Sequence, residues 1–197
     1  MRTAILGGTF NPVHWGHLLL AELAHLEAGY ERVLFVPTRK PAHKTIEGVS
    51  DEQRLVMLQL ALEGFSVPGL TIQIETCELY RPGVSYSIDT VLCVDENYVL
   101  EERAGLLLGD DLFESFDTWK DAPELAQKVD LWVARRKFSD PLVSRFPHHY
   151  FSNPLFPVSS SEIRERVQKN QAWRALVPGP VARYVADHQL YRQGGLE

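Results

Sequence analysis

Cysteine is scarce in this chain of 197 residues, which contains only Cys77 and Cys93. The two residues form no CxxC pair and have no histidine nearby in the sequence, so neither a disulfide framework nor a zinc site is expected. We expect two buried or half-buried thiols in a reducing compartment. A chain of this length can bury a full hydrophobic core without disulfides or structural metal.

Long apolar runs are also absent. No stretch approaches the roughly 18 consecutive apolar residues of a membrane span. The apolar run at the N-terminus, MRTAILGGTF, is too short for a signal peptide and turns directly into glycine. These absences predict a cytoplasmic protein with no membrane partner.

An excess of positive charge is missing as well, because the formal net charge is -6. Nothing at the level of the whole chain indicates a nucleic-acid surface, and no nucleic-acid partner is expected. A small phosphate site remains possible because it needs only local positive charge. Apolar residues make up 45% and charged residues 23%, which is typical of a globular domain.

The first third of the chain predicts one βαβ unit. Residues 3–6 form a short β-type run that ends in a glycine pair. A helix follows from Trp15 with leucines at helical spacing, and Gly29 is its expected C-cap. Residues 32–37 form a second strand closed by proline. This order normally produces a parallel sheet.

The rest of the chain continues the alternation. Ser50 begins a capping-box pattern, and Gly64 is expected to end the helix that follows. Further elements are predicted as strands over 71–75, 104–108 and 130–134, a helix over 86–100, a serine-capped helix start at 159–161, and a last helix over 178–191. No linker interrupts them. We predict one domain over 1–197, an α/β doubly wound parallel sheet with a helical C-terminal extension over about 159–197.

The segment most informative about function, GGTFNPVHWGH, occupies residues 7–17 at the first strand-to-helix turn. A doubly wound sheet places phosphates at this turn, where free helix N–H groups and the helix dipole favour an anion. Gly7 and Gly8 allow the backbone to approach a phosphate. His14 and His17 are three residues apart, so both can face the ligand, and Gly16 keeps the turn thin. An ordinary strand-to-helix connection is the alternative.

The segment is neither the dinucleotide-binding GxGxxG nor the P-loop pattern. It resembles the GGxFxPxHxGH signature of the HxGH nucleotidyltransferases, and specifically of bacterial nicotinate-nucleotide adenylyltransferases. The related pantetheine-phosphate enzymes carry threonine at the position of His14. The resemblance implies a Rossmann-like nucleotidyltransferase fold. It also implies an ATP site that includes Gly7, Gly8, Thr9, Phe10, Asn11 and Gly16.

Further matches follow in the order of that family and span nearly the whole chain. They are PTRKPAHK at 37–44 with Ala42 in place of a second proline, SYSIDT at 85–90, GDD at 109–111, Trp119, the pair Arg135 and Arg136, VSSSEIR at 158–164, LVP at 176–178, Tyr184, and LY at 190–191. One such match would be weak evidence. This many in register identify the chain as similar to the family throughout.

The resemblance assigns roles on the ATP side. Ser159, Ser160 and Arg164 stand at a second helix start, where hydroxyls, N–H groups and a fixed cation suit the β- and γ-phosphates. Gly109 and Asp111 follow a central strand and would receive a ribose hydroxyl. The alternatives are a plain N-cap with a surface arginine, and a surface cap.

On the acceptor side, Lys44 would approach the 5′-phosphate from a basic loop, although a solvated charge run is the alternative. Ser85 and Tyr86 would hold the pyridine end through backbone groups. Trp119 offers a flat surface for stacking, or else a hydrophobic anchor. Of the two adjacent arginines, Arg135 directly follows a strand and is the predicted ligand of the acceptor phosphate.

The implied reaction is in-line attack by a nicotinate mononucleotide phosphate on the α-phosphorus of ATP, with release of pyrophosphate. The acceptor phosphate is already ionised, so no protein nucleophile is needed. Alignment and charge neutralisation by His14, His17, Ser160 and Arg164 would supply catalysis. Mg²⁺ should bridge phosphate oxygens, held mainly by substrate and water rather than by a protein metal site.

Two alternatives remain open at this point. Another acceptor is possible within the same superfamily: nicotinamide mononucleotide, FMN or a phosphorylated alcohol. A non-catalytic nucleotide sensor is a possibility from a different class. The oligomeric state does not follow from the sequence.

Overall fold

The computed structural model describes residues 1–41 and 48–192 of the chain. A six-stranded sheet in this part of the chain has the order β3-β2-β1-β4-β5-β6, and every neighbouring pair is parallel. The strands are β1 (Thr3–Gly8), β2 (Arg32–Pro37), β3 (Thr71–Ile74), β4 (Ala104–Gly109), β5 (Val129–Ala134) and β6 (His149–Tyr150).

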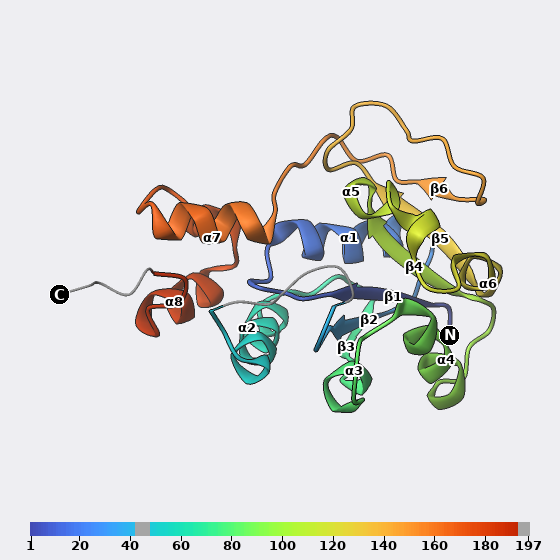
Figure 1. Cartoon of the computed structure of the whole chain (residues 1–197), viewed down its shortest axis with the longest axis horizontal. Coiled ribbons are helices and arrows are strands. Elements are labelled where there is room, and N and C mark those ends of the chain that lie inside the picture. Colours follow the sequence, from blue (N-terminus) through green and yellow to red (C-terminus); the bar gives the residue numbers. More distant parts are fainter. Residues whose placement is uncertain (42–47, 193–197) are drawn as a thin grey trace.

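Helices cover both faces of the sheet (Figure 1). They are α1 (Trp15–Leu26), α2 (Asp51–Glu63), α3 (Cys77–Tyr80), α4 (Ser87–Asn97), α5 (Asp110–Phe113), α6 (Ala122–Lys128), α7 (Ser160–Gln168) and α8 (Gly179–Asp187), with 3₁₀ turns η1 (Phe116–Thr118) and η2 (Arg174–Leu176). One core packs α1, α2, α7 and α8 against the sheet, and a second core packs α4, α5 and α6. The predicted doubly wound fold is confirmed.

Strand alternation explains why two cores form. In β1, Ala4 and Leu6 belong to the first core, whereas Ile5 between them belongs to the second. Successive side chains of a strand point to opposite faces, so a strand buried on both faces must be apolar throughout. The short runs that predicted the strands have this character.

The order of the strands places a crevice beside β1. β1 pairs with β2 on one side and with β4 on the other, so the chain leaves the middle of the sheet in opposite directions after these strands. Ligands of open α/β sheets bind outside the carboxyl ends of the strands at such a switch point. Here those carboxyl ends are Gly8 and Gly109.

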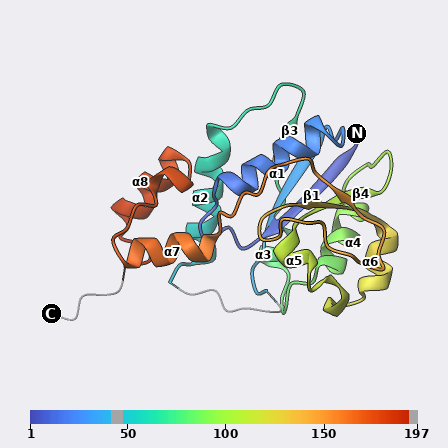
Figure 2. The ribbon, with the colours of Figure 1, turned by 90° about the horizontal axis from the view of Figure 1, so that it is seen from above.

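The C-terminal helices form the extension that the sequence predicts. Figures 1 and 2 show α7 and α8 together at the end of the molecule opposite α4 and α6. α8 packs on α2, while α7 begins beside the loop that precedes α1. The division of the chain into a single domain over 1–197 stays a prediction.

Several element boundaries agree with the sequence predictions, and others need correction. The second strand and the Ser50 capping box are confirmed, and Gly64 is the C-cap of α2. α1 ends with Glu27 as its C-cap, so Gly29 was wrongly predicted as the cap. Gly29 instead adopts the left-handed conformation two residues later, with φ 72°.

Two predicted helices are shorter in the structure because residues beyond them make tertiary contacts. α4 ends at Asn97, and Tyr98 is extended so that its hydroxyl donates to Glu75 at 2.6 Å. α8 ends at Asp187, and Tyr191 takes φ 63° with its side chain buried. α3, α5, α6 and β6 are too short for a periodic pattern and were not predicted from the sequence.

In residues 1–41 and 48–192 the structure contains no helix that is both long and apolar enough to cross a membrane. The cytoplasmic location expected from the sequence stays a prediction.

Candidate functional site

The loop between β1 and α1 presents two imidazole rings at the carboxyl edge of the sheet. His14 is the N-cap residue of α1, and His17 lies in the first turn of the helix. Their ring centroids are 3.8 Å apart, so the predicted juxtaposition of the two side chains is present. An added Cβ at Gly16 would lie 3.0 Å from the His14 ring, so a larger residue there would push against this ring.

Backbone groups decide which ring nitrogens carry hydrogen. Nδ1 of His14 accepts from the N–H of Gly16 at 3.1 Å, and Nδ1 of His17 accepts from the N–H of His14 at 3.2 Å. A neutral imidazole that accepts at one nitrogen carries its proton on the other. Both rings therefore carry a hydrogen on Nε2, and this Nε2–H group is a hydrogen-bond donor.

His14 is held in the neutral form. Its side chain is almost completely buried, and desolvation together with the positive charge of Arg136 lowers the pKa of His14 to about 3. Near neutral pH it is an uncharged hydrogen-bond donor. The burial of His14 argues against a protonated ring at this position.

Further side chains hold the loop between β1 and α1 in place. Arg54 on α2 is fully buried and donates from Nη1 to the carbonyl of Thr9 at 2.5 Å. The hydroxyl of Tyr191 donates to Oδ1 of Asn11 at 2.6 Å. Phe10 is fully buried with its ring edge-on to His17 at 4.9 Å. The side chains of Phe10 and Asn11 thus shape the loop instead of facing the crevice.

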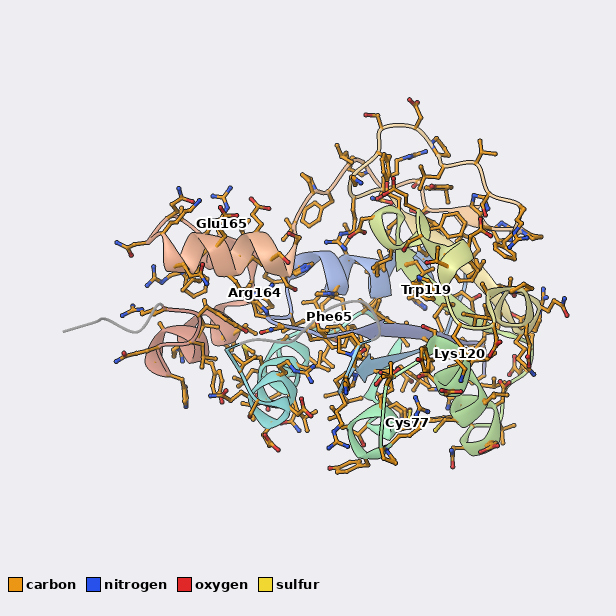
Figure 3. The ribbon with its side chains drawn as sticks, viewed as in Figure 1. Phe65, Cys77, Trp119, Lys120, Arg164 and Glu165 are labelled. Carbon is orange, nitrogen blue, oxygen red and sulfur yellow. The ribbon has the colours of Figure 1, made fainter. Side chains whose placement is uncertain are left out.

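The start of α7 docks on the same loop. Ser159 is the N-cap and accepts from the N–H of Glu162 at 3.1 Å. Ser160 donates to the carbonyl of Pro12 at 2.9 Å, and Arg164 donates to the carbonyl of Asn11 at 2.8 Å. Figure 3 shows Arg164 on the side of α7 that faces this loop. The structure therefore brings the HxGH segment and the second serine-arginine segment together.

The end of β4 carries two adjacent aspartates in different environments. Asp110 is fully buried, and its carboxylate accepts from three successive backbone N–H groups of residues 136–138. Asp111 is half-buried, and both its oxygens lie 3.2 Å from Nη1 of Arg136. A Cβ at Gly109 would clash with the side chains of Asp111 and Arg136, so a larger residue at this position would displace the pair.

The two adjacent arginines point to different neighbours. Arg136 bonds Asp111 and also the carbonyl of Val158 at 2.6 Å, and its charge acts on His14. Arg135 instead donates to the carbonyl of Asn153 at 3.3 Å and lies 5.9 Å from the centroid of the Tyr150 ring. Arg136, which the sequence analysis ranked second, is therefore the arginine beside the crevice.

A cavity of about 180 Å³ opens next to these groups, at the carboxyl ends of β1, β2 and β4. Its lining residues are Gly7, Gly8, Thr9, Thr38, Pro41, Glu78, Ser85, Tyr86, Ser87, Leu106, Leu108, Leu112, Trp119 and Lys120. An added Cβ at Gly7 would meet nothing within 4 Å, so the backbone at this residue faces open space. Ser85, Tyr86 and Trp119 thus lie together, as the sequence analysis expects.

Two features of this cavity suit a planar ligand with a polar end. Trp119 packs on Phe116, with ring centroids 5.2 Å apart. The α4 helix begins at Ser87 without a side-chain cap, so its first N–H groups are open to a ligand. Figure 3 shows Trp119 and Lys120 on the segment between α5 and α6, near the start of α4.

Several residues of the site were given no role from the sequence. Asp110 and Tyr191 lie within segments that match the family, and Arg54 lies in none of them. All three act through contacts with segments far away in the chain, which no local pattern predicts. Glu78 and Lys120 line the cavity but were not singled out. Lys120 directly follows Trp119, and that adjacency is the one signal that could have indicated it. Lys44 lies outside the described residues.

In the described part of the chain, no three His, Cys, Asp or Glu side chains are grouped so as to hold a metal ion. Asp111, at the end of β4, is engaged by Arg136.

Comparisons with known proteins give a family and a fold. A family model described as cytidylyltransferase-like matches residues 5–166. A curated relative from Borrelia hermsii, named "Probable nicotinate-nucleotide adenylyltransferase", is 43% identical over 195 residues, covering 98% of this chain and 100% of the relative. A relative of the same name from Treponema pallidum is 38% identical over 209 residues, with 98% and 100% covered.

The fold also has solved counterparts. The structure of Plasmodium falciparum nicotinic acid mononucleotide adenylyltransferase complexed with NaAD superposes with a TM-score of 0.79, covering 96% of this chain and 97% of that chain. Its sequence identity is 19%, so this likeness establishes the fold alone. The predicted Rossmann-like nucleotidyltransferase fold is confirmed.

Proposed function

The chain belongs to the family of nicotinate-nucleotide adenylyltransferases, and we propose that it transfers the AMP of ATP to nicotinate mononucleotide at the crevice beside β1. The products are nicotinate adenine dinucleotide and pyrophosphate, and the reaction is a step of NAD biosynthesis. One observation carries the location of the site. Two Nε2–H donors and the start of α7 meet on one loop, next to a cavity with Trp119 on its wall.

On the ATP side, the Nε2–H groups of His14 and His17 would donate to phosphate oxygens. Arg164 and the N-terminus of α7 would neutralise the β- and γ-phosphates, and Ser160 would keep α7 docked on the loop. Fixed donors of this kind are effective because they need no reorganisation when charge develops in the transition state. A ribose hydroxyl would bind at Gly109 and Asp111.

On the acceptor side, the pyridine ring would stack on Trp119. Its carboxylate would receive hydrogen bonds from the backbone N–H of Tyr86 and from the first turn of α4. The N–H of Ser85 donates to the carbonyl of Lys40 at 2.8 Å, so Ser85 would contribute as a residue of the cavity wall. We assign the acceptor phosphate to Arg136 in place of Arg135, because Arg135 is turned toward Asn153 and Tyr150. The role of Lys44 stays a prediction.

The chemistry needs no protein nucleophile. An oxygen of the acceptor phosphate attacks the α-phosphorus in line, and pyrophosphate leaves on the opposite side. The residues of the crevice align the two phosphates and shield their repulsion. Mg²⁺ would supply further charge neutralisation between phosphate oxygens. We expect substrate oxygens and water to hold it, because the described residues offer no cluster of ligands.

A coupled assay for pyrophosphate tests this function. Purified protein with ATP and Mg²⁺ is offered nicotinate mononucleotide, nicotinamide mononucleotide, FMN or a phosphorylated alcohol. We expect the fastest release with nicotinate mononucleotide. Preference for another member of the panel would reassign the acceptor, and ATP binding without any release would indicate a nucleotide sensor.

A further inference from the structure

Of the described residues that line the cavity, two carry a formal charge, Glu78 and Lys120, and the charges have opposite signs. They come from different elements, α3 and the segment between η1 and α6. They form no ion pair with each other: Lys120 lies 3.4 Å from Asp89, and Glu78 takes part in no ion pair in the described part of the chain.

Lys120 is the accessible charge. Its side chain is 43% exposed, and Nζ lies 4.6 Å from the centroid of the Tyr86 ring. Its contact with Oδ1 of Asp89 is long and half-exposed, so it contributes little stability. An incoming anion can therefore replace Asp89 as the partner of the Lys120 ammonium group at a small cost in free energy. Tyr86 and Ser87, at the start of α4, line the same cavity, and this helix start has no side-chain cap.

Glu78 is the buried charge. It is 5% exposed, and Oε1 accepts from the hydroxyl of Thr90 at 2.5 Å. Oε2 is buried and has no hydrogen-bond partner among the described residues. Arg81 approaches Thr90 at 3.3 Å rather than Glu78 itself. A buried carboxylate without a cationic partner is costly, so a positive charge in the cavity would be stabilised by it.

The proposed acceptor carries two matching charges. The ring of nicotinate mononucleotide has a positive nitrogen, where the ribose is attached, and a negative carboxylate at the meta position. Nicotinamide mononucleotide keeps the positive nitrogen but has no negative group. A carboxylated ring without the nitrogen has only the negative group.

We propose, building on the proposed function, that Glu78 and Lys120 select the acceptor by its two ring charges. Lys120 recognises the carboxylate and distinguishes the acid from the amide. Glu78 acts through the apolar wall on the positive ring nitrogen and distinguishes a pyridinium from an uncharged ring. The cavity is thus electrostatically complementary to a pyridinium carboxylate.

The test compares three acceptors at saturating ATP: nicotinate mononucleotide, nicotinamide mononucleotide, and the C-nucleoside phosphate of benzoate, which keeps the carboxylate on an uncharged ring. The measured quantity is kcat/KM for each. For Lys120→Met we expect the acid-to-amide ratio to fall about tenfold, as for the loss of a charged hydrogen bond. The ratio of the pyridinium acid to benzoate should stay unchanged.

For Glu78→Gln we expect the reverse pattern: the preference for the pyridinium acid over benzoate falls about tenfold, while the acid-to-amide ratio stays unchanged.

Asp89→Asn removes the anion that competes for Lys120 and should raise the acid-to-amide ratio. Lys128→Met on α6 and Glu96→Gln on α4 make the same chemical changes at residues that do not line the cavity, and they serve as controls.

Two outcomes overturn the proposal. One is a change of less than about twofold in the diagnostic ratio, the size of a weak surface ion pair. The other is an equal loss with all three acceptors, which a merely structural role would produce. Thermal unfolding midpoints monitor folding. If Glu78→Gln does not fold, Glu78→Asp retains the charge and must retain the preference for the pyridinium.

Failure of the proposed function gives a different result. In that case the wild-type protein would form no dinucleotide from either pyridine mononucleotide. If the wild-type protein prefers nicotinate mononucleotide and the ratios do not respond to the variants, only the charge-selection proposal is wrong.

Discussion

His14 and His17 share one arrangement but differ in exposure. His14 is 2% exposed and His17 is half-buried, yet both accept a backbone N–H at Nδ1. The backbone thereby fixes the tautomer, and each Nε2–H is a donor without any protonation.

Replacing His17 tests the role of these donors. We expect His17→Ala to lower the rate of adenylyl transfer by about 10²–10³ at saturating ATP, as for deletion of one fixed donor. The measurement is the turnover number in the pyrophosphate assay. His188→Ala, on the exposed end of α8, is the control. Near-normal turnover of the His17 variant would remove this residue from the mechanism.

Burial of His14 also predicts how stability depends on pH. In the unfolded chain His14 binds a proton below about pH 6.5, whereas in the folded protein its pKa is about 3. The unfolded state therefore binds more protons between these values. Stability should fall as the pH drops through this window, by at most about 1.4 kcal/mol per pH unit from this residue. Above the window His14 contributes no pH dependence.

Denaturant unfolding between pH 7 and pH 4 measures this effect. His14→Asn keeps a side-chain acceptor for the N–H of Gly16 and removes the titrating ring. We expect the variant to lose less stability than the wild type over this range. Equal pH slopes in the two proteins would show that His14 is protonated as readily in the folded state as in the unfolded chain.

At the scale of elements, two helix starts define the site: α7 on the ATP side and α4 on the acceptor side. α7 has a serine cap, so Ser159 satisfies one N–H, whereas α4 has no side-chain cap. Open N–H groups at the start of a helix are suited to an anion. The uncapped start of α4 suits a direct role in holding a carboxylate. At the capped start of α7, Arg164 would hold the phosphate.

Removal of Arg164 tests the ATP side. We expect Arg164→Ala to weaken the use of ATP in the forward reaction and of pyrophosphate in the reverse reaction together, each by about tenfold, because one charged hydrogen-bond donor is lost. Steady-state kinetics in both directions measure this. Arg166→Ala, on the same helix, is the matched control. If the Arg164 variant uses both ligands normally, Arg164 only attaches α7 to the loop.

The elements differ in how well a single sequence predicts them. The starts of α2 and α7 were predicted because their capping signals, at Ser50 and Ser159, lie within one turn of the helix. The end of α4 was not, because Tyr98 is drawn out of the helix by Glu75 and by the Arg32 side chain, 4.7 Å from its ring centroid. Contacts of that range leave no local pattern.

At the scale of the whole molecule, residues that are far apart in the sequence meet at the loop between β1 and α1. Tyr191 reaches Asn11 across 180 residues, and Arg54 reaches Thr9 from α2. The C-terminal helices therefore act as a support that holds the loop between β1 and α1 in shape. Burial raises the pKa of Tyr191 above its usual range, so its hydroxyl remains a donor.

The support predicts a coupling between stability and activity. Tyr191→Phe removes one buried hydrogen bond to the loop, and we expect it to lower the free energy of unfolding by about 1 kcal/mol. The apparent affinity for ATP should fall as well, because the loop is less restrained. Urea unfolding and ATP titration measure the two effects, with Tyr184→Phe as the control. A loss of stability with unchanged ATP affinity would contradict the role of this support.

The sequence by itself determined the fold class, the order of strands and helices up to the short elements, and the segments that form the site. It could do so because apolar periodicity, capping residues and glycine turns act over a few neighbouring residues. The HxGH segment and the other matching segments also indicated the family, which the comparisons confirm.

Only the tertiary structure decided which side chains face one another across the crevice. It turned Arg136 toward Asp111 and Arg135 away from it, buried His14 so that it stays neutral, and set Glu78 and Lys120 into one cavity. Each of these outcomes depends on segments that are distant in sequence but packed against each other. The direction of a side chain and the dielectric around it are properties of that packing, which no local pattern encodes.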